Sequence, residues 1–127
     1  MKKVVLALVL CLTMFFALTS CSLSSLMGLS CEQAEQNLKE AGYTVTIIDG
    51  AEYVDSEDCL FPILSAAELD KYLYAEKGDD KIYIFFFYFT DQAENNSTFM
   101  SMKGMSSGMN NNALYFGTKQ AVKDSKI

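Results

Sequence analysis

The sequence of 127 residues contains no histidine, no tryptophan and no arginine. Histidine is the usual general acid or base near neutral pH, and arginine is the usual partner of phosphate. Without them, a serine or cysteine nucleophile has no imidazole base and phosphoryl transfer has no arginine clamp. No pair of carboxylates at a recognisable spacing indicates glycoside hydrolysis. We therefore expect a protein that is not an enzyme and has no cofactor.

Positive charge is also scarce, because 10 basic residues face 16 acidic ones and the net charge is −6. All the basic residues are lysines. An anionic chain without arginine is poorly suited to nucleic acid, to anionic wall polymers or to anionic lipid headgroups. We expect no nucleic-acid partner.

The N-terminus carries a short basic segment and an apolar run. Lys2 and Lys3 precede the segment VVLALVLCLTMFFAL (residues 4–18), which is typical of a secretory signal and is shorter than the roughly 20 residues of a membrane-spanning helix. The segment LTSC, ending at Cys21, resembles the lipobox of bacterial lipoproteins, with an aliphatic residue, two small residues and a cysteine. The alternative is an uncleaved signal anchor with an incidental cysteine.

The lipobox resemblance implies cleavage before Cys21 and a lipid anchor, with acyl chains such as palmitate, on that residue. Several acyl chains together hold a protein stably at a membrane. We expect a signal peptide over residues 1–20, a lipidated tether over 21–29 and one small domain over 30–127, on the extracytoplasmic face of the cell membrane. The expected partner is then the membrane, and another envelope protein is an open alternative. Removal of Lys2 and Lys3 makes the net charge −8.

Two cysteines remain after Cys11 is removed and Cys21 is acylated. Outside the cytoplasm, Cys31 and Cys59 can form a disulfide, which would contribute about 3 to 4 kcal/mol by constraining the unfolded chain. Alternatively, both are buried free thiols, since Cys31 falls on the apolar stripe of its predicted helix.

Sequence patterns predict a small α+β domain. Ser30 and Gln33 form a capping box before a helix that Gly42 ends. A strand follows over residues 43–48, and an acidic loop over 49–59. Residues 65–76 fit either a helix capped by Ser65 or a strand that forms a hairpin at the KGDD turn, and the hairpin is favoured slightly.

The segment KIYIFFFYF (residues 81–89) predicts a strand that is apolar on both faces. Such a strand is usually central and covered on both sides; the alternative is an aromatic surface for a ligand or for self-association. A second helix is expected over residues 91–109, then a turn at 110–112, a strand over ALYF, and a terminal helix capped by Thr118.

The expected fold is a mostly antiparallel sheet with helices packed on it, in the order α-β-β-β-α-β-α. The layout EAGYTVTII, DDKIYIFFFYF and ALYFGTKQAVKD resembles that of small, mostly uncharacterised lipoproteins of Gram-positive bacteria. This resemblance implies a compact α+β domain and carries no functional residue with it.

Two clusters are candidate ligand sites. Thioethers select Cu(I), and four methionines lie close in sequence: Met100, Met102, Met105 and Met109. Alternatively, Met102, Met105 and Met109 have the spacing of a helix's core face. Carboxylates favour Ca²⁺, but the acidic loop lacks the regular ligand spacing and is read mainly as solvated: Asp49, Glu52, Asp55, Glu57 and Asp58. The leading expectation is a non-enzymatic binding or interaction module whose ligand the sequence does not identify. The alternative is a module that holds a soft metal or a small molecule on the methionine helix or the aromatic strand.

Overall fold

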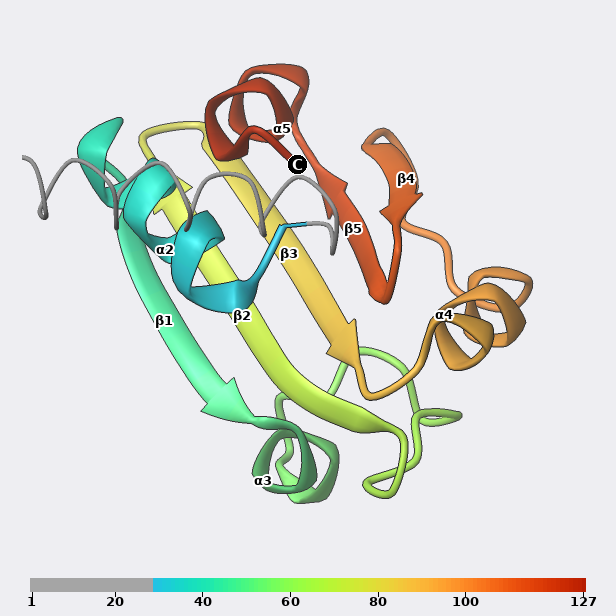
Figure 1. Ribbon diagram of the computed structural model, residues 1–127. Helices are drawn as coiled ribbons and strands as arrows, with labels where there is room; N and C mark the ends of the chain where they lie inside the picture. Colours follow the sequence, from blue (N-terminus) through green and yellow to red (C-terminus); the bar gives the residue numbers. More distant parts are fainter. Residues whose placement is uncertain (1–28) are drawn as a thin grey trace, which may run out of the picture.

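The computed structural model of the protein describes residues 29–127, which fold as a single sheet covered by helices (Figure 1). Cys21 and the expected signal peptide lie outside the described residues. The elements follow one another as α2 (Cys31–Glu40), β1 (Thr44–Asp49), α3 (Gly50–Asp55), β2 (Leu69–Lys77), β3 (Asp80–Phe87), α4 (Thr90–Ser97), β4 (Ser106–Asn110), β5 (Ala113–Gly117) and α5 (Lys119–Ser125).

The five strands form one antiparallel sheet in the order β1-β2-β3-β5-β4. Figure 1 shows them side by side, with β3 in the middle and α2 lying in front of the sheet. The expected α+β class with a mostly antiparallel sheet is confirmed. The element order differs from the expected one by two additions, α3 and β4.

The predicted boundaries of α2 are confirmed in detail. The Ser30 hydroxyl accepts a hydrogen bond from the Gln33 backbone at 3.2 Å, and the Gln33 side chain accepts one from the Ser30 backbone at 3.3 Å. Gly42, just after the helix, has φ +93°, a left-handed conformation that glycine adopts without steric cost. The helix therefore ends at Glu40, shortly before β1 begins at Thr44.

The ambiguous segment over residues 65–76 folds mainly as a strand. Lys77 and Asp80 are register partners across the turn, and Gly78 within it has φ +60°, so the favoured hairpin is confirmed. The predicted helix cap at Ser65 begins only a single turn. Its backbone carbonyl accepts from Glu68 and Leu69 at 3.1 Å each, which makes one turn before β2 rather than a helix.

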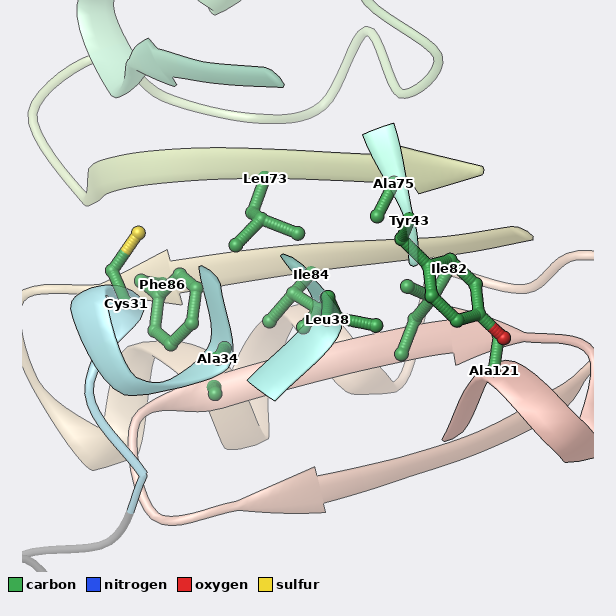
Figure 2. Close-up of a cluster of buried hydrophobic side chains, with 11 residues drawn as sticks. Cys31, Ala34, Leu38, Tyr43, Leu73, Ala75, Ile82, Ile84, Phe86 and Ala121 are labelled. Carbon is green, nitrogen blue, oxygen red and sulfur yellow. The ribbon is translucent and has the colours of Figure 1, made fainter. Parts of the chain in front are cut away.

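The central strand β3 is covered on both faces, as expected. On what we call the α2/α5 face, Ile82, Ile84 and Phe86 pack against helices α2 and α5. Figure 2 shows Leu38 of α2 pointing at Ile84, with Leu73 of β2 nearby. Phe85 and Phe87 point to the opposite side, the α3/α4 face.

The α3/α4 face is covered by two short helices and by irregular chain. Tyr53 of α3, Leu64 and Ala93 of α4 are buried there beside Phe85 and Phe87. The apolar side chains in the middle of β3 are already buried on both sides. They therefore do not form an exposed surface for self-association.

The second helix is much shorter than expected. α4 ends at Ser97, and residues 106–110 form β4 instead. The expected helical stripe of Met102, Met105 and Met109 is therefore wrong. Glycine and serine have low helix propensity, and pairing with β5 gives this segment a full ladder of backbone hydrogen bonds.

Two further expectations are corrected. The acidic segment over residues 49–59 is not simply a loop, because α3 occupies Gly50–Asp55. Thr118 precedes α5 but its side chain does not cap the helix. Its hydroxyl donates to the Asp80 carboxylate at 2.9 Å and accepts from the Lys81 backbone at 3.2 Å, so it ties the helix to β3.

Candidate functional site: a tyrosine-lined pocket

A pocket of about 260 Å³ lies on the α3/α4 face of the sheet. Its walls come from β1, β2, β3, α3 and the segment after α3. The lining residues are Thr46, Ile48, Tyr53, Asp58, Leu60, Tyr72, Tyr74 and Tyr83. Four of the eight are tyrosines, so we call it the tyrosine pocket.

Strand register brings three of these tyrosines together. Tyr74 is the cross-strand partner of both Thr46 in β1 and Tyr83 in β3. Tyr72 lies two residues before Tyr74, and successive side chains of a strand alternate between faces. Tyr72 and Tyr74 therefore project from the same side of β2, and the neighbouring strands add the remaining walls.

The fourth tyrosine closes the pocket from above the sheet. Tyr53 of α3 stacks on Tyr72, with 3.8 Å between ring centroids and 15° between ring planes. Its hydroxyl accepts a hydrogen bond from the Leu60 backbone N–H at 2.9 Å. This bond holds the segment that carries Asp58 and Leu60 against α3, so one wall of the pocket depends on Tyr53.

Gly50 sets how closely α3 approaches the sheet. A Cβ atom at this position would lie 1.8 Å from the Leu69 carbonyl oxygen of β2. Only glycine permits that approach, and it brings Tyr53, three residues later in the chain, over Tyr72.

The tyrosines differ in their hydrogen bonds. The Tyr74 hydroxyl donates to the Glu76 carboxylate at 2.7 Å. Within residues 29–127, the Tyr72 and Tyr83 hydroxyls form no hydrogen bond with the chain. Each of these two groups can donate and accept, so both are free to contact a ligand, as is the Thr46 hydroxyl of the same lining.

Burial makes three phenols of the pocket harder to ionise. It raises the pKa of Tyr53 and of Tyr72 above the ordinary value. It also raises the pKa of Tyr74 to about 12, with a further contribution from the hydrogen bond to Glu76. At physiological pH these groups are hydrogen-bond donors and aromatic surfaces, not phenolate bases.

Asp58 is the single charged residue of the pocket lining. No lysine lines it. Lys71 belongs to the opposite side of β2, where it forms an ion pair with Asp49. Lys81 precedes Tyr83 by two residues and is the register partner of Glu76. The lining is thus aromatic and apolar with one negative charge at an exposed position.

A second hollow of about 350 Å³ lies between α4 and the turn before β2, lined by Ile63, Glu68, Asn95, Asn96 and Phe99. The Asn96 amide already donates to the Glu68 carboxylate at 3.2 Å and to the Gln92 carbonyl at 2.8 Å. Asn96 and Glu68 are thus engaged with each other. We take the tyrosine pocket as the candidate site because its aromatic lining carries the free hydroxyls of Tyr72 and Tyr83.

The structure does not contain the expected disulfide, since Cys31 and Cys59 are both free thiols. Cys31 is buried in the cluster of the α2/α5 face, whereas Cys59 packs against the cluster of the α3/α4 face. The sheet lies between them, so the alternative of two free thiols applies. The Cys59 thiol instead donates to the Phe61 carbonyl at 3.4 Å.

Three of the four methionines pack into the core of the α3/α4 face, and the fourth is exposed. Met100 is buried and Met102 and Met105 pack against the same cluster, whereas Met109 lies on β4 and is exposed. Three of the four thus serve the core of the α3/α4 face. Within residues 29–127, no group of three or more cysteine, aspartate or glutamate side chains is placed to hold a metal ion.

Sequence reasoning did not identify the tyrosine pocket as a site. Tyr72 and Tyr74 alternate with Leu73 in the segment favoured as a strand, and Tyr83 belongs to the expected central strand. The position of Tyr53 was not visible, because α3 was expected to be loop. The useful signal was the combination of two adjacent strands that each place tyrosine on one face.

Comparison with known proteins gives no relative. No protein-family model, no curated protein and no solved structure matches the chain. Among the described residues, no helix has the length and apolar character needed to cross a membrane.

Proposed function

We propose that this protein is a lipid-anchored protein of the cell envelope whose domain binds a small organic ligand in the tyrosine pocket. The lipid on Cys21 attaches it to the extracytoplasmic face of the cell membrane. That part of the proposal is supported by the resemblance of LTSC to a lipobox and by the basic and apolar segments before it.

The observation that carries the binding proposal is that two residues with unpartnered hydroxyls, Tyr72 and Tyr83, line one pocket. Both residues project from the central strands of the sheet. Groups held on rigid strands lose little freedom when a ligand binds. A few fixed polar groups within an apolar lining are typical of small-molecule sites.

The chemistry of the pocket favours binding without transformation. Burial raises the pKa values of Tyr53, Tyr72 and Tyr74. Asp58 is exposed and has no second carboxylate or base beside it in the lining. Acid–base catalysis needs a positioned acid and a positioned base within reach of the substrate, and the lining offers no such pair.

Saturation-transfer NMR on the full chain tests the binding proposal with a panel of amines, phenols, sugars and carboxylic acids. We expect at least one class to bind saturably, and Tyr83→Leu to remove that binding. Tyr88→Leu is the matched control, because Tyr88 follows the same strand but is 53% exposed and outside the pocket. Binding by no class, or binding that survives Tyr83→Leu, contradicts the proposal.

A second candidate function is contact with another envelope protein. It is favoured by Ile63 and Phe99, which border the second hollow and are 52% and 73% exposed. A photo-crosslinking residue at Phe99 tests this in cells, with Glu94 on the exposed side of α4 as the control position. Crosslinks specific to position 99 support the contact, and identical patterns at both positions contradict it.

A further inference from the structure

We propose that the ligand of the tyrosine pocket is an organic ammonium ion of about the size of choline. This inference rests on the proposed function and assigns the chemical class of its ligand. The aromatic surfaces, the charge and the size of the pocket each favour it.

The aromatic surfaces are arranged to hold a cation. The Tyr74 and Tyr83 rings are 5.0 Å apart at an angle of 38°, and both are only half-buried. A cation within about 6 Å of a tyrosine ring is attracted by the negative face of its π system, and aromatic cages recognise quaternary ammonium groups in this way. The hydrogen bond from Tyr74 to Glu76 leaves more electron density on that ring.

The charge of the pocket has the sign that a cation requires. Asp58 is its single charged lining residue. Glu76, which accepts from Tyr74, and its cross-strand partner Lys81 carry opposite charges, and neither lines the pocket. An anionic ligand would meet Asp58 without any compensating cation in the lining.

The size and the lining favour an ammonium ion over a sugar. A volume of about 260 Å³ lies at the lower end of small-molecule sites. Ile48 and Leu60 offer apolar contacts for methyl groups, and the free hydroxyls of Tyr72 and Tyr83 can accept from an ammonium or a ligand hydroxyl. A sugar needs many convergent polar groups, and this lining provides few.

Choline chloride and 3,3-dimethylbutan-1-ol are the probes, because the alcohol has the shape of choline without its charge. The full chain is purified in a maltoside detergent and titrated by tyrosine fluorescence, which the absence of tryptophan leaves unobscured. We expect choline to bind about tenfold more tightly than the neutral alcohol, the ratio typical of a partly desolvated cation–π site.

Two pairs of variants locate the effect. Tyr83→Leu removes one aromatic face and Asp58→Asn removes the charge, and each is expected to weaken choline binding about threefold to tenfold. Tyr83→Phe keeps the ring but removes the free hydroxyl, so it is expected to weaken choline binding less than Tyr83→Leu does, which separates the cation–π contact from loss of folding. Glu57→Gln removes an exposed charge beside the pocket but outside its lining, and we expect no change.

The outcomes distinguish this inference from the proposed function. Equal affinity for choline and the neutral alcohol, with both lost in Tyr83→Leu, overturns the ammonium assignment and leaves a small-molecule pocket. Absence of choline binding also overturns the assignment, and the ligand panel then decides the proposed function by itself. Choline binding that is unaffected by Tyr83→Leu and Asp58→Asn places the cation elsewhere and overturns the inference.

Discussion

Single residues determine how the tyrosine pocket is closed. Gly50 allows α3 to touch the backbone of β2, Tyr53 stacks on Tyr72, and the Tyr53 hydroxyl holds the Leu60 backbone. The approach of α3 to β2 places Tyr53 over Tyr72, and the position of Tyr53 in turn allows its hydroxyl to hold the Leu60 backbone. A change at Gly50 is therefore expected to alter the pocket although Gly50 does not line it.

We predict that Gly50→Ala lowers the free energy of unfolding by about 3 kcal/mol, because the new methyl group would meet the Leu69 carbonyl and force the backbones apart. Gly78→Ala is the control. Gly78 has φ +60° but no atom within 4 Å of its Cβ position, so only backbone strain of about 1 kcal/mol is expected. Urea unfolding measures both, and equal losses would contradict the close approach of α3.

The two cysteines are predicted to be free and unequal in reactivity. Burial raises the pKa of Cys31 to about 12, so its thiol is protonated and unreactive in the folded protein. Cys59 is only half-buried, so solvent reaches it more readily than Cys31. Thiol titration of the processed protein is expected to show Cys59 reacting first and Cys31 only on unfolding. Absence of any thiol in denaturant would contradict the structure and restore the disulfide.

At the scale of elements, local sequence signals correctly predicted the helix ends and turns that depend only on neighbouring residues. The capping box of α2, the stop at Gly42 and the turn at Gly78 all act within a few residues, and each is confirmed. The central position of β3 was also predictable, because a strand with large apolar groups on both faces has to be buried on both.

Elements that depend on distant partners were not predictable. The methionine spacing fitted a helix, but β5 gives this segment a strand partner that no local pattern reveals. The Thr118 hydroxyl was expected to cap α5, yet Asp80 and the Lys81 backbone engage it instead. The tyrosine pocket belongs to the same group, because it needs β2, β3 and α3 together.

Helix α5 is attached to the start of β1 by one side-chain hydrogen bond. The Tyr43 hydroxyl donates to the Asp124 carboxylate at 2.8 Å. This bond holds the pKa of Asp124 below its usual value and contributes, after burial, to raising the pKa of Tyr43. The folded state thus favours the Asp124 carboxylate and the neutral Tyr43 phenol.

We predict that Tyr43→Phe flattens the acid side of the stability profile. A carboxyl whose folded pKa is depressed stabilises the protein above its unfolded pKa of about 4, and that contribution is lost as the pH falls through the lower folded value. Urea unfolding between pH 7 and pH 3 is expected to show a smaller decrease for Tyr43→Phe than for the unchanged protein. Tyr88→Phe is the control, and equal slopes for all three proteins would contradict the link.

At the scale of the whole molecule, the two faces of the sheet differ. The α2/α5 face is filled by a closed core, whereas the α3/α4 face carries both the tyrosine pocket and the second hollow. The expected tether over residues 21–29 leads directly into α2. We propose that one face stabilises the domain and the other presents the ligand site.

The lipid anchor is predicted to depend on Cys21 alone. Cys21→Ala is expected to abolish incorporation of an alkyne-labelled palmitate and to release the protein from the membrane fraction, because the acyl chains supply the attachment. Cys11→Ala is the matched control, since Cys11 lies within the expected signal peptide. Label that persists in Cys21→Ala would contradict the lipobox interpretation.

The most direct test of the central claim is an NMR titration of the full chain with ¹³C-labelled tyrosine rings and choline chloride. The chain has seven tyrosines, and four line the pocket: Tyr53, Tyr72, Tyr74 and Tyr83. We predict saturable shifts confined to these four, whereas Tyr43, Tyr88 and Tyr115 report the rest of the domain and stay unchanged. Shifts confined to those three, or no shift at any tyrosine, would contradict binding of a small organic cation in the tyrosine pocket.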